Sequence, residues 1–334
     1  MSTAERIVVF ACAALACATG LFAAEGRTPI YQPTTITAPG RYVVTRNLSS
    51  PGAPIINVVA SNVTIDLDGH TLDSGAYCTV CATSVEGFVL RNGTLINTGS
   101  SWAIWVNEGR AVTLEDLRVS GQGVSTIRLD SNRGFVLRRL ILRNDVDTGL
   151  YMSNVEDGVV EDVVADQVQA RGIGLFGGQR VRIARVTLRA QAALDTAIDA
   201  QCVQCVIENN LIEGARRGIR ANTSFSRITD NALDGCEDCL EVNGLSNRVL
   251  RNTVGGTSNG IVVNTDGHII EDNHLHGRGT GCGLRIGATT GVIYRANVAR
   301  GYACACSGSG TTDFCDEFGA GNLSGGDNFM PGRM

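Results

Sequence analysis

The sequence contains no lysine, so all 28 of its basic residues are arginine. A Walker phosphate loop and Schiff-base chemistry both require the lysine amine, and the sequence therefore excludes both. The 33 acidic residues give the chain a formal net charge of -5, and the arginines form no continuous basic stretch. Because phosphate backbones bind to basic stripes, we expect no nucleic-acid partner.

Long apolar runs are also missing after the first 22 residues, and we expect no transmembrane segment. The start of the chain has the pattern of a signal peptide. It has a basic stretch that ends at Arg6, an apolar stretch over residues 7–22, and small residues before Glu25. We therefore predict that residues 1–24 are removed and that the mature protein is secreted or periplasmic. Lipoprotein processing at Cys17 is the alternative.

Ten cysteines remain once Cys12 and Cys17 are removed with residues 1–24. They are Cys78, Cys81, Cys202, Cys205, Cys236, Cys239, Cys282, Cys304, Cys306 and Cys315. An even number of cysteines in an exported protein predicts that most of them form disulfides, with bridges favoured within the three C-x-x-C pairs or between loops of neighbouring coils. The alternative is zinc bound by the second and third C-x-x-C pairs, whose spacing is tolerable for a zinc ribbon.

The most informative pattern is a short phrase that recurs eleven times between Asn62 and Arg300: an aliphatic residue, a polar one, a turn residue and another aliphatic one. Aligned on the turn residue, the copies fall at Gly69, Gly93, Leu117, Leu140, Val163, Val186, Asn210, Asn231, Thr253, Asn273 and Asn297. Each copy also contains a strand that begins at a small residue and alternates apolar with variable positions. The pattern predicts an all-β solenoid of about eleven coils, a parallel β-helix without long helices.

The repeat also divides the chain. Residues 62–300 are expected to form the parallel β-helix. Residues 25–61 contain most of the prolines and two short apolar runs, and we expect an N-terminal cap that covers the open end of the core. Residues 301–334 lose the period and are rich in cysteine and glycine. They predict an irregular C-terminal cap, tied to the coils by a disulfide through Cys282.

Two segments resemble the first coils of a known superfamily. They are NVTIDLDGHTL at residues 62–72 and GFVLRNGTL at residues 87–95. Both resemble secreted bacterial members of the pectate-lyase-like superfamily of right-handed, single-stranded parallel β-helices, and this likeness implies the right hand of the solenoid. It implies no single activity, because the superfamily includes lyases, hydrolases, epimerases and phage adhesins. Residues 264–267, NTDG, are similar to a polygalacturonase motif, but the remainder of that pattern is absent.

Two columns of the repeat are predicted to serve structure. The turn column is aliphatic in the first half of the rod and then reads Asn210, Asn231, Thr253, Asn273 and Asn297. Stacked asparagine side chains can form a ladder of hydrogen bonds. The position two residues before the turn reads Glu115, Arg138, Glu161, Ala184, Glu208, Thr229, Arg251, Glu271 and Arg295. Its alternation of sign predicts a ladder of surface ion pairs.

The outward position of the small-residue-initiated strand has a different character. It reads Trp105, Arg128, Tyr151, Gly174, Asp199, Arg220, Glu241, Val262 and Arg285. Rings stack on sugars, and planar polar groups bind hydroxyls and carboxylates, so this face is typical of a sugar-binding groove. The superfamily resemblance implies a groove along the same strand. We assign substrate binding to Trp105, Arg128, Tyr151, Arg217 and Asp238.

Asp199, Arg220 and Glu241, on consecutive coils of that column, are the candidate catalytic residues. Two coils would separate the carboxylates by about 9.6 Å, near the upper end of the range for an inverting glycosidase. In a lyase, an arginine would take the C5 proton of a uronate while carboxylates hold calcium, and no other cofactor is indicated. A further ladder of ion pairs is the alternative. His274 and His276 share a strand face and could bind a metal, although solvated histidines are commoner.

These patterns support two functions. The first is an exported β-helix that binds or cleaves a polysaccharide, as a lyase or a glycoside hydrolase. The second is a non-catalytic structural or adhesive rod, in which the ladders serve stability alone. No feature of the sequence indicates an oligomeric state.

Overall fold

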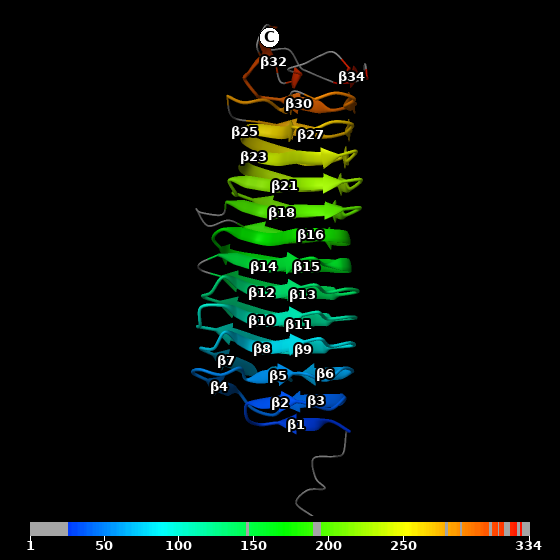
Figure 1. The fold of residues 1–334 in the computed structure, drawn as a ribbon. Coiled ribbons are helices and arrows are strands. Elements are labelled where there is room, and N and C mark those ends of the chain that lie inside the picture. Colours follow the sequence, from blue (N-terminus) through cyan, green and yellow to red (C-terminus); the bar gives the residue numbers. More distant parts are fainter. Residues whose placement is uncertain are drawn as a thin grey trace, which may run out of the picture.

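The computed structural model shows one straight rod of stacked strands, with the C-terminal coils at the end opposite β1 (Figure 1). It describes residues 26–144, 147–189, 195–277, 280–287, 289–306, 309–312, 314–316, 321–325 and 328. The expected signal segment, residues 1–24, lies outside the described residues. No helix that could span a membrane occurs in the part of the chain that is described.

Each coil has three sides, and the strands stack into three faces. Face 1 contains β2 (Thr34–Ile36), β5 (Ile56–Val58), β8 (Cys78–Thr83), β10 (Trp102–Asn107), β12 (Ser125–Asp130), β14 (Thr148–Ser153), β18 (Thr196–Val203), β21 (Arg217–Ser224), β28 (Leu284–Ile286) and β33 (Phe314–Asp316). Face 2 contains β1 (Thr28–Ile30), β3 (Gly40–Val44), β6 (Val63–Asp66), β19 (Val206–Glu208), β22 (Arg227–Thr229), β24 (Arg248–Leu250), β26 (Ile269–Glu271), β29 (Ile293–Arg295) and β34 (Leu323–Ser324). Face 3 contains β4 (Leu48–Ser50), β7 (Thr71–Ser74), β17 (Thr187–Arg189), β20 (Leu211–Glu213), β27 (His274–His276) and β30 (Val298–Arg300).

Seven longer strands pass round a corner and belong to two faces. On faces 2 and 3 these are β9 (Val89–Asn97), β11 (Thr113–Gly121), β13 (Val136–Asn144) and β15 (Glu156–Val168). β16 (Arg171–Ala184) lies on faces 1 and 2, and β23 (Ala232–Leu245) and β25 (Thr253–Val263) lie on faces 3 and 1. Every pairing between coils is parallel, and the hairpin of β31 (Cys304–Cys306) with β32 (Ser309–Thr312) is the antiparallel pair of the described chain.

The predicted fold is confirmed: the chain is a right-handed parallel β-helix. On face 2, eleven strands from β6 to β29 follow one another within the described part of residues 62–300, one for each predicted coil. The segment assigned to the N-terminal cap continues the same ladder, because β1 pairs with β3 and β3 with β6. At the other end, β33 and β34 add to β28 and β29.

The core is a set of aliphatic columns inside the rod. On face 1 the inward column reads Ile104, Ile127, Leu150, Ile173, Ile198, Ile219, Leu240 and Ile261, and all are fully buried. Burial of each such side chain contributes about 1.5–3 kcal/mol relative to exposure. Because side chains alternate along a strand, this inward column also fixes which residues point to solvent.

The corner between faces 2 and 3 is a one-residue turn with a positive φ. Asp116 (φ 55°), Arg139 (φ 53°) and Asp162 (φ 55°) occupy it in three successive coils. The next residue points into the rod, and this position is the predicted turn column. From the seventh predicted coil onward it contains Asn210, Asn231, Asn252, Asn273 and Asn297, all buried.

Asn252 corrects one member of the predicted asparagine ladder. Asn231 Nδ2 donates to Asn252 Oδ1 at 2.9 Å, and Asn252 Nδ2 donates to Asn273 Oδ1 at 3.0 Å. Thr253 pairs instead with Ala232, one position further along, and its side chain is exposed. The sequence alignment was wrong here because Asn and Thr both suit a turn, whereas the ladder uses two donors of one side chain, as Asn252 Nδ2 donates to both Ile228 C=O and Asn273 Oδ1, and a hydroxyl has only one.

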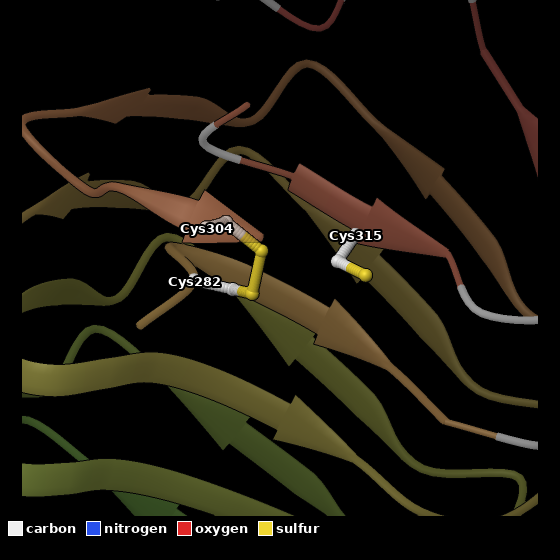
Figure 2. Close-up of side chains that lie close together, drawn as sticks. All are labelled: Cys282, Cys304 and Cys315. Atoms are coloured by element: carbon white, nitrogen blue, oxygen red, sulfur yellow. A yellow bond between two sulfur atoms is a disulfide. The ribbon is translucent and has the colours of Figure 1, made fainter. Parts of the chain in front are cut away.

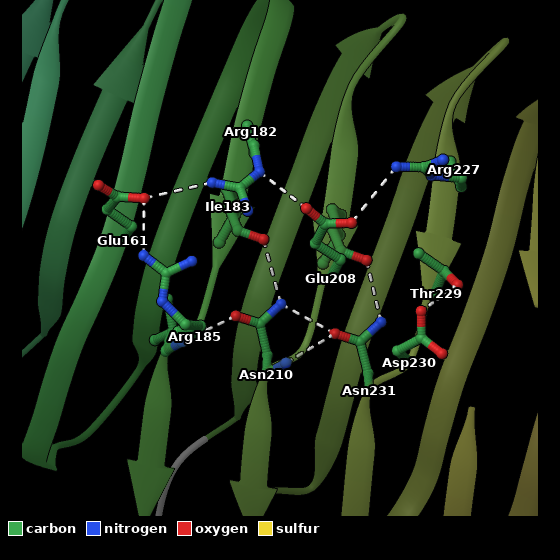
Figure 3. Close-up of polar contacts among 12 residues, drawn as sticks. Glu161, Arg182, Ile183, Arg185, Glu208, Asn210, Arg227, Thr229, Asp230 and Asn231 are labelled. Carbon is green, nitrogen blue, oxygen red and sulfur yellow. Dashed lines mark hydrogen bonds and ion pairs between the residues drawn. The ribbon is translucent and has the colours of Figure 1, made fainter. Parts of the chain in front are cut away.

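The same one-residue error affects the predicted charge column. Leu250, and not Arg251, pairs with Glu271 in register, and Arg251 binds Asp230 at the corner. The gap at Ala184 is filled by Arg182, two residues earlier, whose guanidinium donates to Glu161 at 3.2 Å and to Glu208 at 2.7 Å. Figure 3 shows this ion-pair ladder beside the asparagine ladder. Both predicted ladders are therefore present on face 2 and at its corner.

Three disulfides have both of their cysteines in the part of the chain whose side chains are described. Two close the C-x-x-C pairs Cys78–Cys81 and Cys202–Cys205, as predicted. The zinc alternative is wrong, because Cys202 and Cys205 are bonded to each other. Cys236 and Cys239, the third C-x-x-C pair, are buried free thiols, contrary to the prediction that this pair is bridged.

The third disulfide ties the C-terminal region to the coils, as the sequence predicted for Cys282. It joins Cys282, before β28, to Cys304 in β31. Cys315 of β33 lies beside this bridge, and its sulfur is within 4.8 Å of the other two (Figure 2). The first turn beyond the last regular coil is thereby fixed covalently.

Candidate functional site

The predicted outward column of face 1 is present in the structure. Its members are Trp105, Arg128, Tyr151, Gly174, Asp199, Arg220, Glu241, Val262 and Arg285, each paired with the next in register. Within the column, Gly174 separates two groups of candidate residues. One group is aromatic and the other is charged.

The aromatic group is a continuous stack on the outer surface of β8 to β16, which we call the ring stack. It consists of Tyr77, Trp102, Trp105, Arg128, Tyr151 and Phe176. The ring centroids of Trp102 and Trp105 are 5.3 Å apart, and Tyr77 lies edge-on to Trp105 at 6.3 Å. The Arg128 guanidinium is 5.0 Å from the Trp102 centroid and 4.9 Å from that of Tyr151. Arg128 thus joins the indole rings to the phenol ring by cation–π contacts.

Gly174 allows the ring stack to continue past Tyr151. A Cβ atom at position 174 would lie 2.7 Å from the Phe176 ring, so a larger residue would displace that ring. In its absence, Phe176 lies 5.1 Å from Tyr151. The Arg171 guanidinium lies 5.7 Å from the Phe176 centroid and connects the ring stack with the charged group.

Asp130 holds the central part of the ring stack in place. Its Oδ2 accepts a hydrogen bond from Trp105 Nε1 at 3.0 Å and another from Arg128 Nε at 2.6 Å. A planar ring and a guanidinium are therefore oriented before any ligand arrives. Such preorganisation lowers the entropy cost of binding.

Two atoms of the ring stack region have an unused capacity for hydrogen bonds. Trp102 Nε1 and Ser125 Oγ are both buried and have no partner in the described structure. The two residues pair in register on β10 and β12. Buried polar atoms nearly always have a hydrogen-bond partner, so an unpaired N–H donor and an unpaired hydroxyl on neighbouring strands are unusual.

The charged group, which we call the charged cluster, comprises Arg171, Asp195, Asp199, Arg217, Arg220 and Glu241. Asp199 is 2% exposed, and its Oδ2 accepts a hydrogen bond from Arg171 Nε at 3.2 Å. Its Oδ1 has no hydrogen bond in the described structure, and neither has the buried Nε of Arg220, the next residue of the column. The Arg220 Nε lies 3.6 Å from Glu241 Oε2, which is an ion pair beyond hydrogen-bond distance.

Glu241 is held from several sides. Arg217 Nε lies 3.7 Å from its Oε2, and Asn243 Nδ2 donates to its Oε1 at 3.2 Å. Arg217 also contacts Asp195, 3.5 Å away. Burial raises the pKa of Asp195, but hydrogen bonds from Arg216 and Thr196 outweigh it and keep that pKa below its usual value. Asp195 is therefore ionised at neutral pH and helps to orient Arg217.

Each predicted site residue lies on face 1, but the residues do not form one site. Asp199, Arg220, Glu241 and Arg217 meet in the charged cluster. Asp238 pairs with Arg217 in register, yet its carboxylate accepts from Asn259 Nδ2 at 2.7 Å. The predicted binding residues of the ring stack lie at least two strands away from Asp199, on the other side of Gly174.

The sequence reasoning missed Arg171, the cation that contacts Asp199. A signal existed, because Arg171 precedes a strand-initiating glycine just as Arg217 does, and both pair with Thr196. No set of three carboxylates converges in the described residues in a way that would hold calcium, and we assign no reaction step to a cation. His276 lies 3.8 Å from Asp234, and the alternative of a metal bound by His274 and His276 gains no third ligand among the described residues.

A hollow of about 590 Å³ lies beside the ring stack, at the corner between faces 1 and 2. Its lining includes Ser84, Glu108, Ser131 and Asn154, which directly follow the ends of β8, β10, β12 and β14. Ser84 Oγ donates to Glu108 Oε2 at 2.7 Å. This polar hollow and the ring stack are thus adjacent surfaces of the same coils, while the charged cluster lies further along the rod.

No protein-family model matches the sequence, and no curated protein sequence matches it. Among solved structures, the chain is similar to the Dettilon tailspike protein, with a TM-score of 0.58 and 12% identity over 86% of this chain. The match spans 60% of the tailspike chain, less than two thirds of its length. The chain is also similar to the DFA-IIIase of Arthrobacter chlorophenolicus A6 in complex with GF2, with a TM-score of 0.55, 13% identity, and coverage of 91% and 93%. At these identities the likeness shows the parallel β-helix fold alone.

Proposed function

We propose that this protein is exported and binds a polysaccharide along the outer surface of face 1. The ring stack is the observation that carries the proposal. Tyr77 is exposed and the other rings of the stack are partly exposed. Apolar surface left open on a rod marks a site for a partner, and the flat faces of the rings suit the C–H surfaces of sugar rings. The similar DFA-IIIase structure is a complex with GF2, so a ligand site is compatible with this fold.

Export is supported by chemistry as well as by the start of the chain. The disulfides Cys78–Cys81, Cys202–Cys205 and Cys282–Cys304 are stable in oxidising compartments outside the cytoplasm. We therefore place the mature protein in the periplasm or the medium. Intact-mass measurement of the exported protein tests this, with an N-terminus near Glu25 as the expected result.

We further propose that Asp199, Arg220 and Glu241 are the catalytic residues if the polysaccharide is cleaved, by a lyase or a glycoside hydrolase. Asp199 Oδ1 and Arg220 Nε are both covered, so a sugar hydroxyl would bridge them only after the more exposed Arg171 and Arg220 side chains move aside. Glu241 is the more accessible carboxylate, with 21% of its side chain exposed against 3% for Asp199. Glu241 is accordingly the better candidate for proton transfer, and Asp199 for positioning.

The binding test uses Trp105→Ala and Tyr151→Ala on a glycan array, followed by calorimetry with the best glycan. Each variant should bind about tenfold more weakly, as expected for the loss of an aromatic contact of ~1.4 kcal/mol. Tyr31→Ala and Phe225→Ala are matched controls, because both rings are exposed but lie outside the ring stack. Equal affinity in all four variants would refute glycan binding by the ring stack.

The cleavage test incubates the protein with a polysaccharide panel, with and without calcium. Ultraviolet absorbance detects unsaturated uronates, and a reducing-end assay detects hydrolysis. Glu241→Gln and Arg220→Ala should abolish any turnover and leave the fold intact, whereas Arg227→Ala on face 2 should change nothing. If the wild-type protein binds a glycan but cleaves none, the catalytic part of the proposal is wrong and the binding part stands.

A non-catalytic rod is the second candidate, and the completeness of the two ladders on face 2 favours it. A rod of this kind needs stability and no ligand. Absence of reproducible binding to any glycan, together with lowered stability in the ring-stack variants, would select this function.

A further inference from the structure

Arg118 and Arg143 differ from the arginines of the ion-pair ladder. They lie on the outer surface of face 3, on the neighbouring strands β11 and β13, at diagonal positions: Arg118 pairs with Ile141 and Arg143 with Ser120. Long side chains at diagonal positions can reach each other. On the same strand Arg138 and Arg139 each contact a carboxylate, but Arg118 and Arg143 have none within 4.0 Å in the described structure.

Arg143 is notable because a carboxylate is available to it. Asp166 is its partner in register on β15, yet no ion pair forms between them. Arg143 instead lines a hollow of about 450 Å³ together with Arg118, Thr94 and Ser120. This volume falls within the range of ~300–1,000 Å³ that is typical of ligand sites.

The composition of the hollow defines what it can bind. Two guanidinium groups and two hydroxyls surround it, and Ile96 and Ile141 provide an apolar part. Two neighbouring cations without a counter-charge repel each other, and an anion between them would remove that repulsion. Guanidinium groups bind planar oxyanions through two hydrogen bonds at once.

A second, smaller hollow extends this surface. It has a volume of about 130 Å³, shares Ile96, Ser120 and Arg143 with the first, and continues to Gln122 at the corner towards face 1. A ligand larger than a single ion could therefore extend from the two arginines towards that corner. The amide of Gln122 is exposed there and free to contact a sugar hydroxyl.

We propose that the hollow around Arg118 and Arg143 binds the oxyanion group, sulfate or carboxylate, of an acidic glycan. This site lies on face 3 and is separate from the ring stack and the charged cluster. It would anchor the glycan without taking part in chemistry. The oxyanion part of the inference stands without the proposed function, and the glycan part rests on it.

The test is calorimetry with the mature protein and three oligosaccharides of equal length: a sulfated dextran, the unsulfated dextran and an oligouronate. The double variant Arg118→Gln/Arg143→Gln should bind the sulfated or uronate probe about tenfold more weakly, the effect of losing charge-assisted hydrogen bonds. The unsulfated dextran should be unaffected by the change. Which of the two acidic probes binds more tightly distinguishes sulfate from carboxylate.

The control is Arg46→Gln/Arg248→Gln, which removes the same charge from exposed arginines elsewhere on the rod. It should leave the affinity within about twofold. An equal loss in both double variants would mean nonspecific attraction and would overturn the site, as would wild-type protein that binds neither acidic probe.

Two further variants complete the test. Ser120→Asp places a carboxylate next to both arginines and should abolish oxyanion binding while the unfolding midpoint holds or rises. Trp105→Ala should leave binding of inorganic sulfate alone unchanged. Loss of sulfate binding in Trp105→Ala would contradict a separate site, so failure of this inference and failure of the proposed function can be told apart.

Discussion

The outer surfaces of faces 1 and 2 both have rows of arginines and carboxylates, but the hydrogen bonding of these side chains is complete on face 2 and incomplete on face 1. On face 2, Arg182 connects Glu161 to Glu208, and the asparagines at the adjoining corner satisfy one another. On face 1, Asp199 and Arg220 are also neighbours in register, but each keeps a buried atom without a hydrogen bond. A complete ladder has no capacity left for a ligand, whereas an incomplete one has. This difference supports the proposal that face 1, and not face 2, binds a ligand.

The largest loss of stability is expected when the buried asparagine ladder beside face 2 is interrupted. Asn252→Ala removes the acceptor for Asn231 N–H and Nδ2, and the donor to Ile228 C=O. Leaving these buried groups unpaired should lower the free energy of unfolding by about 4 kcal/mol. Thr253→Ala, the matched control one residue later, should cost less than about 0.5 kcal/mol. Urea denaturation measures both, and a larger loss for Thr253→Ala would show that the ladder was assigned to the wrong residue.

The second prediction concerns the pH dependence of stability, which depends on a buried, hydrogen-bonded histidine. His268 is fully buried, and its Nδ1 accepts the Asn247 N–H at 3.1 Å. Burial lowers the pKa of His268 from 6.5 to about 4, against a smaller opposing effect of Asp266. The unfolded chain therefore takes up the proton first as the pH falls. Stability is complete above pH 6.5 and should decrease by about 3 kcal/mol as the pH falls to 4.

This prediction is checked by unfolding curves of His268→Asn between pH 7 and pH 4. The variant should show a flatter dependence in this window, while His274→Asn, which changes an exposed histidine, should follow the wild type. Aspartates such as Asp162 and Asp230 have lowered pKa values because of hydrogen bonds from arginines, and they lose their contribution only below about pH 3.8. Identical slopes for wild type and His268→Asn would refute the assignment.

The smallest effect compares the two faces directly. Arg182→Met breaks a half-exposed link between two carboxylates and should cost about 1 kcal/mol or less, with a decrease at high salt. Arg220→Met should cost less still, because its Nε makes no hydrogen bond to lose. If Arg220→Met proves the more destabilising, the charged cluster is a stability ladder and its proposed function falls.

Much of the fold could be predicted because aligning the repeats also aligns the residues that pair between neighbouring coils. Matching one strand in each copy was sufficient to place Trp105, Arg128 and Tyr151 in one column, and Asp199, Arg220 and Glu241 in another part of it. Errors arose where two neighbouring residues suit the same turn, as with Asn252 and Thr253. The candidate site was predicted only as a set of neighbours, because sequence alone does not show which guanidinium reaches which carboxylate.

The sequence by itself determined the solenoid, its coils and the direction in which each side chain points. The reason is that inward aliphatic columns recur at a period that only stacked strands can bury together. The tertiary structure alone decided that Arg171 contacts Asp199, that Gly174 gives room to Phe176, and that Arg143 lines a hollow with Arg118 without an ion pair to Asp166. These outcomes depend on side-chain conformations across coils, where several partners compete within reach of one charge. Side-chain packing and burial determine which of these partners each charge contacts, and the repeat pattern in the sequence does not contain that information.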